Sequence, residues 1–263
     1  MRAISIMYHD VLSRGENDES GFPWPDAGLY KLERAQFVEH IEAIAAAIRH
    51  KPISVFDLSR GINESIPLLL TFDDGGSSAH ACVAEILEAM GWRGHFLVTA
   101  NYVDHPAFLT RAQIRQLHGR GHVIGTHSSS HPMRMSQCSW EEMMQEWNSS
   151  VEALSDIIGV RVKVGSVPGG HYSRQVAETA SLAGIEMLFT SEPTTKCHSV
   201  NGCLVLGRYT VQRWMSSHVA AAIASGKILP RVRQLLYWNA KKVTKALGGA
   251  YYLRLRESLL GRE

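Results

Sequence analysis

Long apolar runs and paired cysteines are both missing from this sequence. No stretch approaches the ~18 consecutive apolar residues of a membrane-spanning helix. Residues 1–9 lack the long apolar core and the small-residue cleavage site of a secretory signal peptide. The four cysteines show no tight spacing, which is typical of reduced thiols that pack in a core. We therefore expect a cytoplasmic protein without a disulfide scaffold.

A strong excess of either charge is also absent. The net charge of +2 gives no indication of a nucleic-acid partner. The charges are unevenly spread, because residues 227–263 hold nine basic and two acidic residues, which leaves residues 1–226 at −5. With 263 residues and 45% hydrophobic content, one large α/β domain can bury a full core. We predict a domain over 1–226 and a distinct basic tail over 227–263.

Seven short apolar runs are predicted to be strands, and helical patterns lie between most of them. This alternation favours parallel βαβ units. By pattern alone, a (β/α) barrel and a doubly wound open sheet are equal contenders, and 53–56 is a candidate for an additional short strand. The expected strands are 3–8, 67–72, 94–99, 122–126, 162–167, 185–190 and 203–207, and the expected helices are 34–49, 79–90, 110–120, 139–158 and 173–183.

Two adjacent carboxylates, Asp73 and Asp74, end the apolar run 68–72 and are followed by two glycines. Successive side chains of a strand point to opposite faces, so neighbouring acids cannot share a site from inside a strand. Beyond the strand's end, glycines allow the backbone to turn sharply and bring both acids together. We interpret the pair as part of a catalytic rim, with a solvated turn as the alternative.

A pair of histidines, His127 and His131, follows the predicted strand 122–126. Histidines four residues apart share one face of a helical turn and can bind one metal ion. Pro132 disfavours helix at the preceding residue and keeps the turn short. With a carboxylate from the aspartate pair as third ligand, we predict a metal site. The alternative is two unrelated polar residues.

These motifs resemble those of the polysaccharide deacetylases, the NodB-homology domain of carbohydrate esterase family 4. The resemblance rests on residues 71–75, 127–131 and the intervening 91–99, and it extends over roughly 66–170. It implies a distorted seven-stranded (β/α) barrel of the NodB-homology type. It also implies a metal-dependent carbohydrate N-deacetylase, a hydrolase acting on a C–N bond other than a peptide bond.

The resemblance also assigns roles at the site. Asp73 is expected to be the general base, and Asp74, His127 and His131 are expected to bind one divalent ion. Zn²⁺ is the expected metal, with Co²⁺ or Ni²⁺ as alternatives. Such an ion polarises the acetyl oxygen and favours deprotonation of water. Active sites of (β/α) barrels lie at the carboxyl ends of the strands, where the polar residues of this sequence gather.

Two departures from the family pattern lead to further predictions. The third motif, here residues 165–170, lacks its usual arginine, and the last motif, an aliphatic pair before His-Asp, is missing near the chain's end. Residues 6–10, Ile-Met-Tyr-His-Asp, resemble that last motif. We therefore predict a circular permutation, as in exopolysaccharide deacetylases acting on poly-N-acetylglucosamine, with His9 as general acid. The alternative for His9 is a rim histidine bonded to a backbone carbonyl.

Four residues near the last strands complete the predicted site. Gly169 is a candidate backbone donor to the oxyanion, with a simple Pro-Gly turn as the alternative. Pro168, Tyr172 and Arg208 are predicted to contact substrate. Arg208 could also replace the missing arginine by bracing Asp73, although a surface ion pair is the favoured interpretation.

The basic tail carries apolar residues near helical spacing: Leu229, Val232, Leu235, Leu236, Val243 and Leu247. A basic amphipathic helix of this kind can lie on an anionic membrane, which would make the protein peripheral at the inner face. It can also pack its apolar stripe on the barrel, and this second interpretation is favoured.

The predicted function is removal of N-acetyl groups from an amino sugar, with release of acetate. The expected partner is an N-acetylated glycan, either a polysaccharide or a lipid-linked sugar, and no nucleic acid. One alternative is a glycoside hydrolase, which needs two carboxylates about 5–9 Å apart across a sugar. The other is a carbohydrate-binding relic without deacetylase activity.

Overall fold

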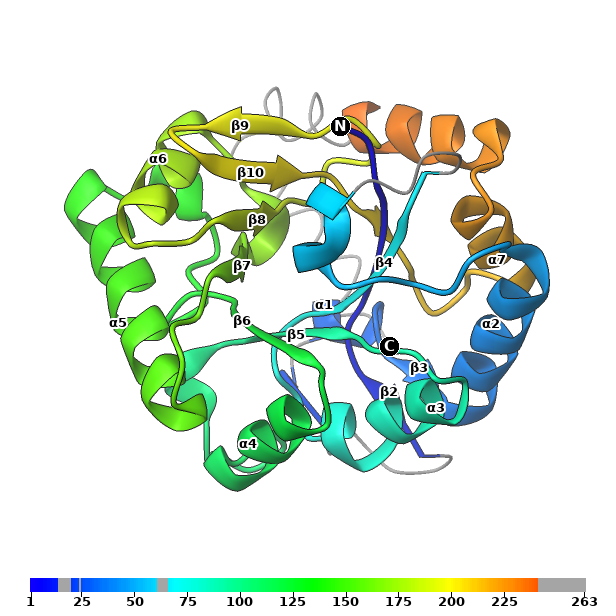
Figure 1. Cartoon of the computed structure of the whole chain (residues 1–263), viewed down its shortest axis with the longest axis horizontal. Helices are drawn as coiled ribbons and strands as arrows, with labels where there is room; N and C mark the ends of the chain where they lie inside the picture. The colour runs from blue at the N-terminus through cyan, green and yellow to red at the C-terminus, as the bar shows by residue number, and fades with distance from the viewer. Residues whose placement is uncertain (14–19, 24, 61–65, 241–263) are drawn as a thin grey trace.

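A curved sheet of nine strands forms the centre of the protein (Figure 1). The computed structural model describes residues 1–13, 20–23, 25–60 and 66–240. Across the sheet the strand order is β11-β1-β4-β5-β6-β7-β8-β10-β9, and every neighbouring pair is parallel except β10 with β9. The strands are β1 (Ile4–Tyr8), β4 (Leu68–Phe72), β5 (His95–Val98), β6 (Val123–Thr126), β7 (Val164–Ser166), β8 (Met187–Phe189), β9 (His198–Val200), β10 (Cys203–Leu206) and β11 (Tyr209–Thr210).

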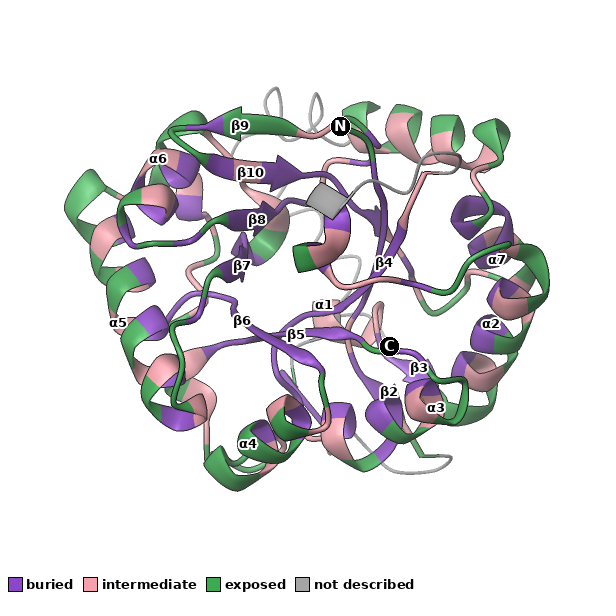
Figure 2. Ribbon diagram, viewed as in Figure 1, coloured by how far each residue is buried: buried purple, intermediate pink, exposed green. Residues whose placement is uncertain are grey.

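Helices surround this sheet and leave their exposed faces outside, as Figure 2 shows in green. A smaller parallel pair, β2 (Val11–Leu12) and β3 (Leu32–Glu33), lies beside them. The helices are α1 (Pro25–Gly28), α2 (Arg34–Ala47), α3 (Ala84–Ala89), α4 (Arg111–Gly119), α5 (Trp140–Ile158), α6 (Arg174–Leu182) and α7 (Ser217–Ala224), and a further helix covers 228–240. No helix in the described ranges is both long and apolar enough to cross a membrane.

Local sequence signals explain where the longer helices begin and end. Ser139 begins α5 with a capping box, in which its side chain accepts from the Glu142 backbone and the Glu142 side chain accepts from the Ser139 backbone. Gly159 ends the same helix in the left-handed conformation, with φ of 76°. Thr110 and Gln113 form an equivalent capping box at the start of α4. Most boundaries therefore fall where the sequence pattern predicts them.

The seven predicted strands are all present, and the incomplete (β/α) barrel is confirmed. The additional strand proposed for 53–56 is wrong, because a 3₁₀ helix begins at Val55. The backbone N–H of Val55 donates to the ring of His95, 2.9 Å away, instead of to a neighbouring strand. Helix α7 and strands β9 and β11 extend the predicted set.

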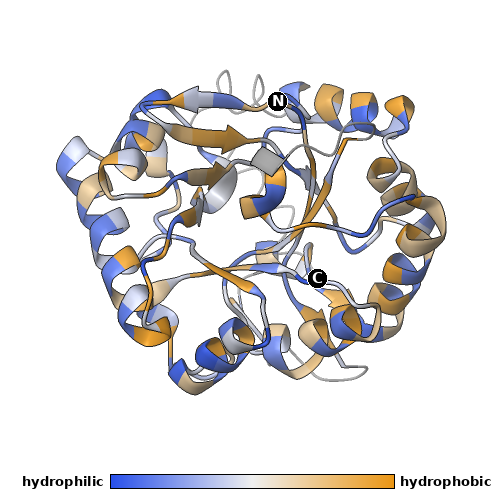
Figure 3. Ribbon diagram, in the orientation of Figure 1, coloured by the Kyte–Doolittle hydropathy of each residue, from blue (hydrophilic) through white to orange (hydrophobic). Residues whose placement is uncertain are grey.

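Two apolar cores lie on the two faces of the curved sheet. One lies between the sheet and the helices and includes Leu68, Leu70 and Phe72. The other fills the interior of the barrel and includes Leu69, Val164 and Leu206. Because side chains alternate along a strand, odd positions of β4 face the interior and even positions face the helices. The apolar strands appear orange in Figure 3, with bluer loops at their ends.

Candidate active site

Polar side chains close one end of the barrel interior. Asp73 lies two residues beyond inward-facing Thr71, Ser166 two beyond Val164, and Arg208 two beyond Leu206. The period of two therefore directs all three side chains to the same place at the carboxyl ends of the strands. Their bonds to one another, described below, confirm that they meet. This is the rim where a (β/α) barrel carries its active site.

Arg208 holds the carboxylate of Asp73 from across the interior. Its Nη1 and Nη2 donate to Oδ1 and Oδ2 of Asp73 at 2.6 and 2.7 Å. It also donates to the Thr71 hydroxyl and the Thr190 carbonyl. Arg208 and Asp73 are both buried, so the favoured interpretation of a surface ion pair is wrong. These four hydrogen bonds to protein atoms support a role of Arg208 in positioning Asp73, while its predicted contact with substrate stays a prediction.

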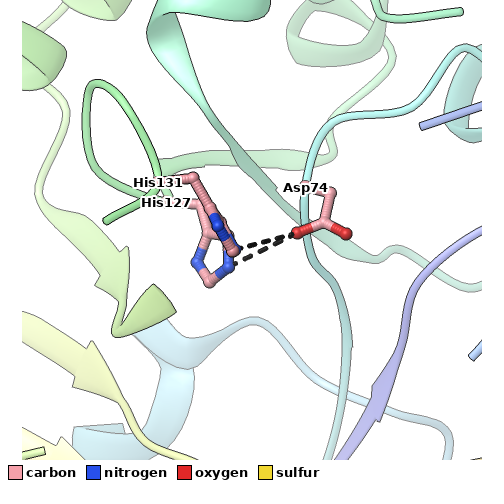
Figure 4. A group of neighbouring side chains, drawn as sticks. All are labelled: Asp74, His127 and His131. Carbon is pink, nitrogen blue, oxygen red and sulfur yellow. Dashed lines mark ion pairs between the residues drawn. The ribbon is translucent and has the colours of Figure 1, made fainter. Parts of the chain in front are cut away.

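Asp74, His127 and His131 form a compact group of possible metal ligands (Figure 4). Oδ1 of Asp74 lies 3.5 Å from Nε2 of His127 and 3.6 Å from Nε2 of His131. Ligand atoms around a tetrahedral Zn²⁺ lie roughly 3.4 Å apart, as bond lengths of about 2.0–2.1 Å require. The donor set and its spacing therefore fit one divalent ion, and the three residues predicted as ligands lie together.

The backbone around these ligands is held in sparsely populated conformations. Asp74, Ser128 and His131 all have positive φ, at 74°, 64° and 59°. Such angles are costly for residues other than glycine and persist only where the surroundings fix them. Glu146 of α5 provides part of that support, because its carboxylate accepts the N–H groups of Ser129 and Ser130 at 2.9 and 2.8 Å and the Ser130 hydroxyl at 2.6 Å.

Ser166 connects the first histidine to the aspartate pair. With Nδ1 of His127 as donor, the ring bonds the Ser166 hydroxyl at 2.5 Å and the Ser166 carbonyl at 3.2 Å. The hydroxyl in turn donates to Oδ1 of Asp73 at 3.3 Å. A proton fixed on Nδ1 leaves Nε2 free to bind a cation, as in other histidine metal sites. Burial also lowers the pKa of His127 to about 3, which keeps its ring neutral.

The two aspartates differ in charge state because their neighbours differ. Burial alone raises the pKa of the Asp73 carboxyl, but the charge of Arg208, the nearby His127 and the hydrogen bonds from Arg208 together more than offset this, so its pKa lies below the ordinary value. Burial and then the nearby Asp73 and Asp10 carboxylates raise the pKa of Asp74 well above its usual range. A cation bound at Asp74 would offset that repulsion. Asp73 is thus a ready carboxylate, and Asp74 lies where a positive charge is needed.

His9 lies at the same rim, at the end of β1. This strand pairs with β4, and the Asp73 N–H donates to the Tyr8 carbonyl at 3.1 Å. The His9 ring lies 4.7 Å from the Tyr30 ring. Its Nδ1 is buried and has no hydrogen-bond partner within the part of the chain that the structure describes, which argues against a carbonyl-bonded structural histidine. Burial lowers the pKa of His9 to about 4, although the Asp73 carboxylate opposes the shift.

The Pro-Gly-Gly turn lies against the metal-ligand loop. Gly169 has φ of 62°, and a Cβ there would lie 2.9 Å from the carbonyl oxygen of Met133. Pro168 is buried at the start of this turn. Tyr172 packs partly against the outer core, and its hydroxyl lies 3.3 Å from the His198 ring. Gly169 therefore stays a candidate backbone donor, while the contacts of Tyr172 are with the protein.

Sequence reasoning missed several supporting residues. Phe22 lies against His131, with ring centroids 4.9 Å apart and the two rings tilted by 50°. Glu146 lies in a segment without a motif that marks its role. For Ser166 the available signal was its place in the third motif, where the expected arginine is absent.

Comparisons with known proteins agree with this geometry. Residues 61–188 match the family model described as polysaccharide deacetylase. The chain is also 23% identical over 155 residues to YxkH of Bacillus subtilis (strain 168), whose name describes it as a polysaccharide deacetylase. That match covers 59% of this chain and 55% of YxkH, so this chain matches little more than half the length of its relative.

Solved structures share the fold at low sequence identity. The Streptococcus pyogenes deacetylase PplD, in complex with acetate, has a TM-score of 0.67 and 19% identity, over 82% of this chain and 95% of PplD. IcaB from Ammonifex degensii has a TM-score of 0.67 and 18% identity, over 85% of this chain and 97% of IcaB. Residues 61–188, the part of the chain that matches the polysaccharide deacetylase model, contain both the aspartate pair and the histidine pair.

Proposed function

We propose that this protein removes N-acetyl groups from an amino-sugar glycan by metal-dependent hydrolysis and releases acetate. The observation that supports this most is the arrangement of the three ligand residues beside a separate carboxylate. Asp74 has two histidine nitrogens within 3.6 Å, whereas both carboxylate oxygens of Asp73 accept hydrogen bonds from the Arg208 guanidinium. One acid is therefore available to bind a cation and the other to accept a proton.

Asp74, His127 and His131 would hold one divalent ion, Zn²⁺ in our proposal, with Co²⁺ or Ni²⁺ as alternatives. When bound, such an ion polarises an acyl oxygen and favours the deprotonation of water. Ser166 fixes the ring of His127, and Glu146 fixes the loop that leads to His131. These supports keep the ligand atoms in place before substrate arrives, so less ordering is required during the reaction.

Asp73 acts as general base in this proposal. Arg208 keeps its carboxylate ionised and oriented, so it can take a proton from the attacking water. His9 lies close enough to interact with the charge of Asp73 and supplies the proton to the departing amine. Since His9 is neutral at pH 7, the proton that it delivers comes from the attacking water by way of Asp73. The backbone N–H of Gly169 is our candidate donor to the oxyanion.

The substrate in our proposal is an N-acetylated polysaccharide of the exopolysaccharide type or a lipid-linked glycan. Two features support this class: the Tyr8-His9 pair at the end of β1, and the fold shared with a deacetylase crystallised with acetate. A glycoside hydrolase is less well supported, because one of the two neighbouring acids is engaged by Arg208 and the other faces two histidines.

Acetate release tests the proposal directly. We expect the purified protein to release acetate from N-acetylglucosamine oligomers or lipid-linked sugars, to stop in excess chelator and to recover with Zn²⁺. Shortened sugars without acetate would indicate a glycosidase, and sugar binding without any product would indicate a relic. Activity that persists in excess chelator would exclude the metal-dependent mechanism.

Asp73→Asn separates the roles of the two aspartates. We expect this variant to bind Zn²⁺ like the wild type, because Asp73 is not one of the three proposed ligands. Its turnover should fall by roughly 10²–10⁴, the usual contribution of a general base. Metal content is measured on the dialysed protein, beside initial rates of acetate release. Loss of bound metal in Asp73→Asn would reverse the two assignments.

A further inference from the structure

The helix at 228–240 exposes an apolar stripe to solvent. Ile228, Leu229, Val232 and Leu236 are 70, 80, 42 and 64% exposed. Their spacing places them on one side of the helix. Isolated apolar side chains are ordinary on protein surfaces, but a group of four large ones on one helical face marks a site of interaction. This helix is the orange one in Figure 1, and it carries exposed green residues in Figure 2.

The opposite side of this helix is attached to the edge of the sheet. The side chain of Gln234 accepts from the Thr210 N–H at 3.0 Å and donates to the Thr210 carbonyl at 2.8 Å. Arg231 donates to the Gly226 carbonyl at 2.9 Å. Gln234 thus holds the helix against the end of β11, Arg231 ties it to the preceding turn, and the apolar stripe faces away from the barrel.

The favoured expectation from sequence, an apolar stripe packed on the barrel, is therefore wrong for the described part of the tail. Leu229, Val232 and Leu236 stay exposed, whereas Leu235 is half-buried. The remaining predicted stripe positions, Val243 and Leu247, lie outside the described residues.

The positive charge of residues 227–263 indicates which kind of partner surface could cover the apolar stripe. Residues 227–240 contain Lys227, Arg231 and Arg233 and no acidic residue. Over 227–263 the sequence has nine basic and two acidic residues. A second copy of the chain would bring a segment with a net charge of +7 against an identical one, which is unfavourable. A surface with negative charges and an apolar interior matches both the stripe and its basic neighbours.

We propose that the exposed side of helix 228–240 docks on an anionic lipid bilayer. An amphipathic helix lying in the interface buries its apolar face about 5–10 Å into the boundary between headgroups and acyl chains, and nearby basic residues strengthen the attraction to anionic lipids. The helix is fixed to β11, so docking holds the whole barrel at the membrane. This proposal is independent of the chemistry at the rim.

Vesicle flotation with the full-length chain tests the proposal. We expect it to float with vesicles of mixed phosphatidylglycerol and phosphatidylcholine, to stay unbound with phosphatidylcholine alone and to be released by high salt. Arg233→Gln should weaken binding about fivefold, the contribution of one charge near the surface. The double variant Leu229→Gln/Leu236→Gln should weaken it more than tenfold. Leu182→Gln, which alters a leucine of α6 that is 64% exposed, is the matched control and should bind like the wild type.

Several outcomes of these experiments would overturn the proposal. The inference fails if the chain ignores anionic vesicles, binds neutral ones equally well, or keeps wild-type affinity in the double variant. A dimer seen by light scattering without lipid, and lost in the double variant, would assign the stripe to a second copy instead. Thermal melting verifies that the double variant is folded, and Arg233→Gln remains informative if it is not. Acetate release in solution should be the same for wild type and variants, so the test of membrane binding is independent of the test of deacetylase activity.

Discussion

Asp73 receives its charge partner from a residue 135 positions away along the chain. Strands β4 and β10 are not neighbours in the sheet, so Arg208 reaches Asp73 across the top of the barrel interior. The small side chain of Ser166 lies beside the same carboxylate, within the stretch 165–170 that contains no arginine. A guanidinium from the connection between β10 and β11 therefore supplies the positive charge that the buried Asp73 carboxylate needs to stay ionised.

Arg208→Met tests this pairing. The variant leaves an unpaired buried carboxylate, so we expect a loss of roughly 3–5 kcal/mol in the free energy of unfolding. The pKa of Asp73 should rise without the guanidinium, and the acid limb of the pH–rate profile should move to higher pH. Arg208→Lys should lose less stability and raise the pKa of Asp73 less than Arg208→Met, because lysine keeps the positive charge but not the bidentate geometry. Arg213→Met, at an exposed arginine, is the control. An unchanged pH profile in Arg208→Met would refute the positioning role.

At the scale of elements, β1 and α5 bring essential parts to a site whose motifs lie elsewhere. Strand β1 lies between β11 and β4, which places His9 next to Asp73, the position that a circular permutation predicts. Helix α5 supports the ligand loop through one side chain, Glu146, whose carboxylate accepts three hydrogen bonds. These bonds stabilise a loop in which two residues have positive φ. The helix thus fixes the separation of His127 and His131.

Glu146→Ala should loosen this loop and weaken metal binding. Second-layer supports of metal ligands are typically worth 10–100-fold in affinity, and we expect a loss in that range when Zn²⁺ is titrated into the metal-free protein. Glu146→Gln keeps an acceptor for the Ser129 and Ser130 N–H groups and should retain most of the affinity. Glu152→Ala, at an exposed position of the same helix, is the control. Equal affinities in Glu146→Ala and the control would show that α5 does not hold the loop.

At the scale of the whole molecule, the barrel interior contains a histidine, His95, whose hydrogen bonds hold the ring in its neutral form. His95 donates from Nδ1 to the Leu70 carbonyl at 2.8 Å and accepts at Nε2 from the Val55 N–H at 2.9 Å. A second proton on Nε2 would face the Val55 N–H, which is also a donor, so the ring is neutral in the native state. Burial lowers the pKa of His95 from 6.5 to about 4. In the unfolded chain the ring can be protonated freely at pH 5.

This difference makes the protein less stable in acid. Because the folded pKa is the lower one, the stability that His95 contributes is complete above pH 6.5 and is lost as the pH falls towards 4. From pH 7 to pH 5 the loss attributable to this residue is about 2 kcal/mol. Denaturant unfolding of the wild type and His95→Gln at both pH values measures it, with exposed His50→Gln as control. An equal pH dependence in wild type and His95→Gln would contradict the assignment.

The sequence by itself determined seven strands of the main sheet, most boundaries of the predicted helices and the three proposed metal ligands. These are local properties, since alternation, capping residues and the spacing of Asp74, His127 and His131 follow from neighbouring residues. Only the tertiary structure decided which distant residues support them. Whether Arg208 reaches Asp73, and whether helix 228–240 turns its leucines inward or outward, depends on closure of the barrel and on the edge of β11. Such pairings join positions far apart in the chain, and no pattern within a single segment encodes them.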